Sequence, residues 1–348
     1  MRALVTGATG FIGGAVAREL LAHGWEVRCL ARPAADLTNL EGLDAELARG
    51  DVRERPAVAA AVQGCDAVFH VAALYSFDPR QRRAIHDVNV GGTLNVLECA
   101  RAAGVCRVVY TSTSGTIGLR HDRRPAGEGE PLTPAHLVND YKRSKYQAEQ
   151  QALRLARGGL DVVIVNPTAP VGPGDVKPTP TGMVLVRFLR RQMPAYADTG
   201  LNIVDVADVA AGHRLAFEQG RSGERYILGN RNLALAELLR LLAGLTGLPA
   251  PRLKSPYWMS WLAAALSEAV QARLLRRAPA LTLGEVRMSR WHMFYDASKA
   301  VRELGLPQSP VEDALCRAVE WFVQRGYAPR PPRVGRQMRA PDKTNAPA

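Results

Sequence analysis

The sequence predicts an α/β fold, a doubly wound parallel sheet with a smaller, partly interleaved substrate lobe in the C-terminal half. Apolar runs alternate with helical patterns through the first half of the chain, and a glycine-rich turn follows the first run. After Pro167 the pattern changes to a loop rich in Pro and Gly. Strands that alternate with helices form a parallel sheet, because each helix returns the chain to the same edge.

Each segment of the alternation has the residues its element needs. The first strand, "RALVTG", leads into an amphipathic helix, "FIGGAVARELLAHG", which ends at Gly24. Pro56 opens a later short helix, where its missing N–H is not needed. The other expected strands are EVRCLA, AELARG, DAVFHVAA, CRVVYTST and LDVVIVNP, and the other expected helices are PAVAAAVQG, NVGGTLNVLECARAAG and AHLVNDYKRSKYQAEQQALRLARG.

We expect residues 1–170 to form a dinucleotide-binding domain. Residues 203–230 are expected to return to it, because they contain one further strand, "RYILGN". The ranges 171–202 and 231–328 are expected to form the substrate-binding lobe. The tail, residues 329–348, has no apolar periodicity and is expected to be disordered.

Composition narrows the class of protein and its partners. The chain has 348 residues and a net charge of +12, but 39 of its 45 basic residues are Arg and none form a run with interleaved aromatic residues. This indicates a solvated basic surface and no nucleic-acid partner. The five cysteines form no C-x-x-C motif, and no signal peptide is recognisable, so we expect a reduced, cytoplasmic protein. A homodimer is left open.

The glycine-rich turn predicts a phosphate-binding loop. Gly7, Gly10 and Gly13 give G-x-x-G-x-x-G between the first strand and the first helix. Glycines at this place allow a tight turn and a close approach of the backbone to a pyrophosphate, and the helix N-terminus offers free N–H groups. We therefore expect a dinucleotide cofactor there.

The end of the second strand bears on the choice between NAD(H) and NADP(H). NAD-binding proteins usually carry Asp or Glu at this place, but here Ala31 is followed by Arg32, with Arg28 earlier on the strand. A guanidinium suits a 2′-phosphate, which favours NADP(H) over NAD(H). The alternative is a surface Arg in an Arg-rich chain. Asp51, after the third strand, is placed to contact the adenine amino group.

Two copies of Tyr-x-x-x-Lys occur, Tyr141 with Lys145 and Tyr295 with Lys299. Residues four apart on a helix face the same way, so either pair could transfer a proton. The spacing alone is weak evidence, and the surroundings must decide between the copies. The first follows a Ser/Thr-rich strand end, "TSTSGTIG", whereas the second precedes "ASKAVRELG", which has the pattern of a helix start with Ser298 or Asp296 as a cap.

Several motifs in order resemble the extended short-chain dehydrogenase/reductase superfamily, whose dinucleotide-binding domain has the Rossmann fold. The resemblance covers about residues 1–325. It rests on TGATGFIGG, GD at 50–51, FHVAA at 69–73, VNVGGTLNVLECA at 88–100, VVYTSTSGTIG at 108–118, YKRSK at 141–145 and NPTAPVGPG at 166–174.

The resemblance implies a catalytic set and a cofactor site. Thr113 would hold the substrate oxygen, Tyr141 would move the proton, and Lys145 would hold the nicotinamide ribose and lower the pKa of the Tyr141 phenol. The second pair is then a structural copy. The positions implied for the cofactor are Gly7, Thr9, Gly10, Phe11, Ile12, Gly13, Arg32, Asp51, Val52, Val71, Ala72, Ala73, Asn89, Thr111, Tyr141, Lys145, Pro167 and Thr168.

Two stretches are similar to a branch of this superfamily, the hopanoid-associated sugar epimerases, which lies near the dihydroflavonol 4-reductases. They are GDVKPTPTG at 174–182 and MPAYADTGLNIVDVADVAAGH at 193–213. The branch implies a sugar-like or lipid-linked substrate. Nucleotide-sugar epimerases carry an Arg where Leu201 stands, so either another Arg (Arg187, Arg190 or Arg191) grips a diphosphate or the substrate is not a nucleotide sugar.

Three functions are therefore weighed. The first is an epimerase-like oxidoreductase acting at a secondary alcohol or ketone of a sugar-like substrate. The second is an NADPH-dependent ketone reductase, and the third is a dinucleotide-sensing protein without turnover. The complete set of Thr113, Tyr141 and Lys145 argues against the third.

The substrate lobe contains Trp258, Met259 and Trp261 in a short apolar stretch. We expect these side chains to form part of the core of the lobe. An amphipathic helix on a membrane surface is the alternative.

Overall fold

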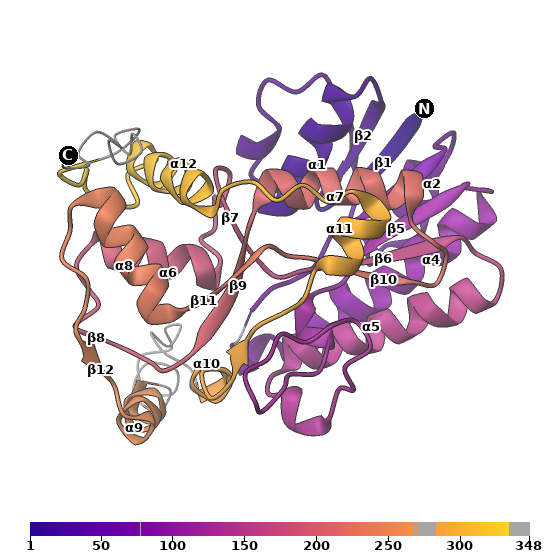
Figure 1. Ribbon diagram of the computed structural model, residues 1–348. Coiled ribbons are helices and arrows are strands. Elements are labelled where there is room, and N and C mark those ends of the chain that lie inside the picture. Colours follow the sequence, from indigo (N-terminus) through magenta and orange to yellow (C-terminus); the bar gives the residue numbers. More distant parts are fainter. Residues whose placement is uncertain (77, 268, 270–282, 334–348) are drawn as a thin grey trace, which may run out of the picture.

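The computed structural model describes residues 1–76, 78–267, 269 and 283–333. These residues form two lobes, a large one built on a parallel sheet and a smaller one that holds helices α6, α8, α9 and α12 (Figure 1). Most of the tail that we expected to be disordered, residues 334–348, lies outside the described residues.

The large lobe confirms the expected doubly wound Rossmann sheet. Its seven strands lie in the order β10-β6-β5-β4-β1-β2-β3, and all neighbouring pairs are parallel. The carboxyl ends of all strands therefore meet at one edge, where ligands bind in such sheets. The strands are β1 (Arg2–Thr6), β2 (Glu26–Ala31), β3 (Glu46–Arg49), β4 (Ala67–His70), β5 (Arg107–Thr111), β6 (Val162–Pro167) and β10 (Arg225–Leu228).

Helices cover both faces of this sheet. One face carries α1 (Phe11–Ala22), α7 (Val206–Gln219) and α11 (Ser298–Leu304), and the other carries α2 (Arg55–Val62), α4 (Gly92–Ala102) and α5 (Asp140–Arg157). A short helix, α3 (Arg82–His86), packs beside α5. Because α11 packs on α7 and β10, this part of the range 231–328 lies with the large sheet.

Helix α5 begins five residues later than the expected helix over residues 135–158. The Asn139 side chain accepts a hydrogen bond from the Lys142 N–H at 2.8 Å and so caps the helix. Residues 134–136 form a separate turn, which Thr133 and His136 close. The cap fixes where the helix starts and with it the direction in which Tyr141 points.

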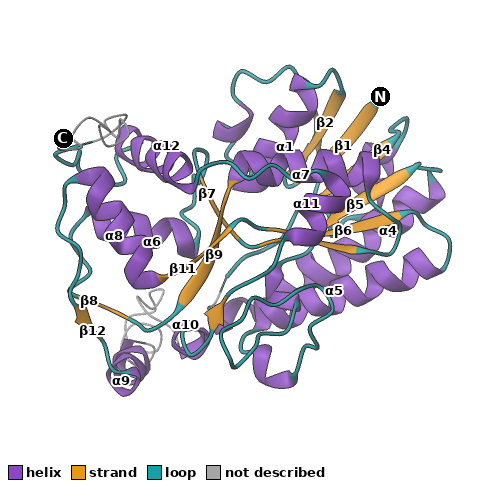
Figure 2. Ribbon diagram, in the orientation of Figure 1, coloured by secondary structure: helices purple, strands orange, loops and turns teal. Residues whose placement is uncertain are grey.

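The smaller lobe is built around β9 (Gly200–Asp205), which links three other strands. It pairs antiparallel with β11 (Arg231–Ala234) and parallel with both β7 (Ala169–Val171) and β13 (His292–Met293). Figure 2 shows these strands between the two groups of helices. The other elements are α6 (Pro180–Leu189), α8 (Leu235–Thr246), α9 (Tyr257–Ser267), α10 (Leu283–Met288), α12 (Val311–Gln324), β8 (Ala195–Tyr196) and β12 (Leu253–Lys254).

The aromatic stretch of this lobe is not part of its core, so that prediction was wrong. The exposed fractions are 65% for Trp258, 48% for Met259 and 45% for Trp261. The core is formed instead by α6, α8 and α12. Helix α9 lies at the margin of the lobe, and only Ala264 of this helix is buried.

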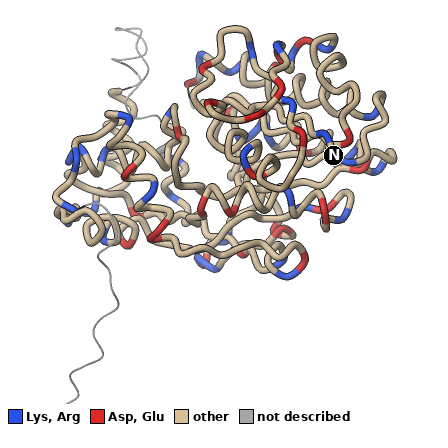
Figure 3. The backbone as a smooth tube through the Cα atoms, turned by 90° about the horizontal axis from the view of Figure 1, so that it is seen from above, with Lys and Arg blue, Asp and Glu red and all other residues tan. Residues whose placement is uncertain are grey.

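Charge is mixed over the molecule. Basic and acidic residues are interspersed in both lobes (Figure 3), and many Arg side chains are paired with carboxylates at the surface. This agrees with a solvated basic surface. Within the described ranges, no helix has the length and apolar content that crossing a bilayer requires.

Candidate active site

The glycine-rich loop needs glycine for steric reasons. Gly7 has a φ of +74°, and a Cβ there would lie 2.6 Å from the Ala72 nitrogen. A Cβ at Gly13 would lie 2.1 Å from the Gly7 carbonyl oxygen, so α1 could not pack so close to the loop. The loop therefore allows the close backbone approach that a pyrophosphate requires.

The first turn of α1 is open to an anion. Gly10 caps the helix without a side-chain acceptor, and no acidic residue lies in the first turn. The N–H groups of Phe11 and Ile12 and the positive end of the helix dipole thus fit a pyrophosphate. Asn39, which sequence reasoning missed, fixes the loop by donating to the Thr9 carbonyl at 3.2 Å and the Gly174 carbonyl at 2.9 Å.

The adenosine end of the expected site is basic. Arg32 directly follows β2 and is exposed, and its charge helps to lower the pKa of Asp51. The largest cause of that lowered pKa is the hydrogen bond from Arg53, which holds both Asp51 oxygens. Arg28 serves the fold instead, since it pairs with Glu46 at 2.8 Å and donates to carbonyls at the end of α2.

The other expected cofactor positions line the carboxyl edge of the sheet. Asn89 has a structural role as well, because its amide bonds the backbone of Leu74 and the Ser144 hydroxyl at 2.9 Å. It thereby ties the loop after β4 to α5. The positions along the edge are Val52 after β3, Val71, Ala72 and Ala73 after β4, Thr111 at the end of β5, and Pro167 and Thr168 at the end of β6.

Lys145 is buried under the end of β5. Its ammonium donates to the Thr111 carbonyl at 2.7 Å and lies 4.5 Å from the centre of the Tyr110 ring. Burial lowers the pKa of Lys145 to about 7, and the negative charge of Glu149, one turn further along α5, opposes this shift. The protonated fraction of Lys145 is therefore sensitive to its neighbours near neutral pH.

The side chains of Tyr141 and Thr113 contact each other. A hydrogen bond between their side chains favours the ionised phenol, but burial dominates and raises the pKa of Tyr141. Tyr141 also packs edge-on against Tyr75, with ring centres 4.3 Å apart. The Lys145 ammonium donates to the Thr111 carbonyl, and the expected lowering of the phenol pKa by Lys145 stays a prediction.

A buried chain of hydrogen bonds, which sequence reasoning missed, connects the phosphate loop to α4. The Thr6 hydroxyl bonds His70 Nδ1 at 2.7 Å, and His70 Nε2 bonds the Thr93 hydroxyl at 2.9 Å. Thr93 in turn donates to the Asn89 carbonyl at 2.6 Å. Burial lowers the pKa of His70 to about 3, so the ring is neutral and serves as a structural link.

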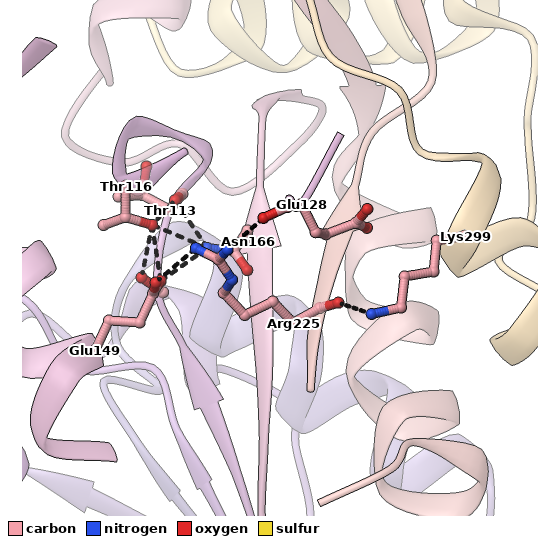
Figure 4. A network of polar contacts seen from close by, with 8 residues as sticks. Thr113, Thr116, Glu128, Glu149, Asn166, Arg225 and Lys299 are labelled. Carbon is pink, nitrogen blue, oxygen red and sulfur yellow. Dashed lines mark hydrogen bonds and ion pairs between the residues drawn. The ribbon is translucent and has the colours of Figure 1, made fainter. Parts of the chain in front are cut away.

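Glu149 anchors a second buried network beside the loop that carries Thr113 and Thr116 (Figure 4). Its carboxylate accepts from the Thr116 hydroxyl at 2.7 Å, from the Asn166 amide at 3.0 Å and from Arg225 at 3.3 Å. Asn166 also donates to the Thr113 carbonyl at 3.0 Å. Glu149 therefore acts on both Lys145, through its charge, and the Thr113 loop, through Thr116 and Asn166.

The second Tyr-x-x-x-Lys copy makes contacts that support the fold, and it is not remote from the first. Tyr295 is buried, and its hydroxyl bonds the side chain of Ser114, the residue after Thr113. The second pair, which the sequence places far from this Ser/Thr-rich loop, therefore contacts it. Lys299 donates to the Arg225 carbonyl at 2.8 Å and pairs with Glu224 at 2.7 Å, so its ammonium supports β10.

A loop for pyrophosphate and a Thr-Tyr-Lys set thus share one edge of a parallel sheet. The sequence model of the NAD-dependent epimerase/dehydratase family matches residues 3–229 of the chain. The chain belongs to this family. The family binds a nicotinamide dinucleotide, and the chain is an NAD(P)-dependent enzyme of the short-chain dehydrogenase/reductase type.

The enzyme is similar to proteins with several names. A putative dihydroflavonol 4-reductase of Synechocystis sp. is 48% identical over 93% of this chain and 95% of its own. Sterol demethylase protein B of Methylococcus capsulatus is 37% identical over 94% of this chain and 99% of its own. The solved structure of gox2253 is 43% identical, with a TM-score of 0.83. That of PA4631, a nucleoside-diphosphate-sugar epimerase of Pseudomonas aeruginosa, is 28% identical, with a TM-score of 0.78. Each match covers 94% of this chain and 99% of the other.

We predict that Tyr141→Phe lowers turnover about 10²–10⁴-fold, because it removes the proton donor and keeps the ring. Cofactor affinity should stay nearly unchanged. Lys145→Met should weaken both turnover and cofactor binding. Steady-state kinetics and calorimetric titration of the cofactor would measure these effects.

Tyr295→Phe is the matched control, with identical spacing to a lysine. It removes one buried hydrogen bond to Ser114, so it should lower the free energy of unfolding by about 1 kcal/mol and leave the proton donor in place. Loss of turnover in folded Tyr295→Phe, with Tyr141→Phe active, would reverse the assignment of the two copies.

We also predict that Glu149→Gln moves the alkaline limb of the pH profile of kcat/KM to lower pH, by about one unit. Lys145 is charged below its pKa and loses its charge as pH rises through it. Removing the Glu149 charge lowers that pKa further, so activity is lost at a lower pH. Glu312→Gln, which breaks a surface pair with Arg231, should leave the limb unchanged. An unshifted limb in folded Glu149→Gln would contradict this role.

Proposed function

We propose that the enzyme reduces a ketone on an apolar substrate, with NADPH as the reductant. The observation that carries this proposal is Leu201, at the place where nucleotide-sugar epimerases have an Arg. Leu201 lies on β9, opposite Leu233 and Met293, and packs against the apolar core of the smaller lobe. An apolar side chain among apolar neighbours offers nothing to a diphosphate.

The three arginines that could replace the missing Arg are poorly placed to bind a diphosphate. Arg190 and Arg191 are exposed at the end of α6. Arg190 is held at the outer side of the lobe, where its Nε donates to the Tyr327 carbonyl at 2.6 Å. Arg187 is partly buried on the same helix and already has interaction partners. These placements favour a substrate without a diphosphate.

The basic end of β2 supports NADPH. Arg32 is exposed beside the expected adenosine site, and no acidic residue occupies the end of β2. An epimerase returns its hydride to the substrate and can retain one cofactor, whereas an exchangeable NADPH suits net reduction. The name of the Synechocystis relative includes a reductase, and that of the Methylococcus relative includes a sterol, an apolar molecule.

The residues of the site have distinct roles in this reaction. Thr113 and Tyr141 would hydrogen-bond the carbonyl oxygen, and Tyr141 would donate the proton that completes the alcohol. Lys145 would hold the nicotinamide ribose, and its positive charge would stabilise the phenolate that remains when Tyr141 has given up its proton. When bound, NADPH supplies the hydride for the carbonyl carbon. Glu149 and Asn166 hold the Thr113 loop in position.

The second candidate is an epimerase acting on a sugar-like substrate, including one linked to hopanoid lipids. It rests on the two stretches at 174–182 and 193–213 and on the likeness to PA4631, which is described as a sugar epimerase. This candidate predicts no net consumption of cofactor.

Absorbance at 340 nm separates the two candidates. Purified enzyme with an apolar ketone, such as a dihydroflavonol or a 3-keto steroid, should consume NADPH steadily, and NADH much more slowly. Arg32→Ala should weaken NADPH binding by about 1.5–3 kcal/mol, because a charge-assisted contact to phosphate is lost, and should leave NADH binding unchanged.

Arg83→Ala, at an exposed position on α3, serves as the control for a general effect of removing an Arg. Equal use of both cofactors, unaffected by Arg32→Ala, would contradict the preference for NADPH. Interconversion of sugar epimers without net change at 340 nm would replace the reductase by the epimerase.

A further inference from the structure

Helix α9 exposes an unusual number of apolar side chains. It has 11 residues and no charged one. Among the described residues, eleven large apolar side chains are exposed, and seven of these lie within one stretch of 14 residues. The seven are Leu253, Tyr257, Trp258, Met259, Trp261, Leu262 and Leu266.

These side chains form a continuous face. At about 100° per residue, the six on α9 cover an arc of roughly 200°, and the buried Ala264 lies outside that arc. Soluble proteins rarely leave such a surface facing water, and large exposed apolar patches mark binding surfaces. The helix forms an outer edge of the smaller lobe (Figure 1), so the face is accessible to a flat partner.

Basic residues border this face. Arg252, Arg287 and Arg290 are exposed on the adjoining segments, and the Arg290 guanidinium lies 5.5 Å over the Tyr257 ring. The sequence from 252 to 290 contains seven basic and two acidic residues. An apolar face with Trp and Tyr and a basic border is suited to the interface of an anionic lipid bilayer.

We propose that α9 and its basic border bind the surface of a bilayer that contains anionic phospholipids. The apolar face would enter the boundary between headgroups and acyl chains, and the three arginines would contact lipid phosphates. A second copy of the chain fits less well. A two-fold contact through α9 would bring the basic borders of both copies into one interface, and like charges oppose such a contact.

The position of α9 connects membrane binding to the reaction, and this part of the argument rests on the proposed function. Helix α9 packs against α10, and Met288 of α10 accepts a hydrogen bond from Asn139 at 3.5 Å. Asn139 caps α5 two residues before Tyr141. Trp291, just after α10, packs against the rings of His121 and His136. An apolar ketone dissolved in the bilayer would thus be taken up close to the catalytic helix.

Co-sedimentation of the full chain with lipid vesicles tests the proposal. We expect binding to vesicles of phosphatidylcholine and phosphatidylglycerol in equal amounts, weaker binding to phosphatidylcholine alone, and release by added salt. Trp258→Ser combined with Trp261→Ser should reduce binding about tenfold or more, because both indole rings leave the interface. Arg287→Glu combined with Arg290→Glu should reduce binding to the mixed vesicles only.

Matched controls separate these effects from a general change of the surface. Leu47→Ser combined with Val301→Ser removes two exposed apolar side chains elsewhere, and Arg83→Glu reverses an exposed charge on α3. Both should bind vesicles like the wild type. No substrate or cofactor is needed, so the result does not depend on the proposed reaction.

Sedimentation velocity without vesicles tests whether a second copy of the chain, and not a bilayer, covers the apolar face of α9. If the wild type does not bind vesicles, or if the Trp variant binds as strongly as the wild type, the proposal is wrong. Conversion of a dimer into a monomer by the Trp variant, without vesicle binding by the wild type, would assign the face to a second copy of the chain.

Discussion

The site depends on one buried positive charge, the ammonium of Lys145. Burying an ammonium is costly unless it is hydrogen-bonded or paired. Here the Thr111 carbonyl, the Tyr110 ring and the Glu149 carboxylate share that stabilisation. These three groups come from β5 and α5, so the charge also fixes the helix against the strand. The cap at Asn139 then determines where Tyr141 lies relative to Thr113.

The loop after β5 is held from both lobes, which explains how a short segment keeps a defined geometry. Asn166 of β6 and Glu149 of α5 hold it from the large lobe. Tyr295, in the segment after β13, holds it through Ser114, and the Tyr295 carbonyl accepts from Asn202 of β9 at 3.2 Å. The segment that carries Tyr295 therefore links the Thr113 loop to β9 of the smaller lobe.

Features with local causes could be predicted from the sequence, namely the order of strands and helices, the glycines of the phosphate loop and the Tyr-x-x-x-Lys pair on one helix. Asn39, His70 and Glu149 were missed because their partners lie far away in the chain, such as Gly174 for Asn39 and Arg225 for Glu149. The error at Trp258 and Trp261 has another cause. The sequence shows that these side chains are apolar, but whether an apolar side chain is buried depends on how the helix packs in the folded protein. The link from Tyr295 to Ser114 likewise arises only when both lobes are folded.

The most direct test is to titrate the Lys145 ammonium itself. The chain has only six lysines, so protein labelled with carbon-13 lysine gives a simple spectrum, and Lys145→Met and Lys142→Met assign two of its signals. The arrangement predicts a pKa of about 7 for Lys145 and of about 8 for Lys142, both below the ordinary value for a lysine. A Lys145 signal that titrates at about 10.4, the ordinary pKa of a lysine, would show that its ammonium is not buried and would contradict this account of the site.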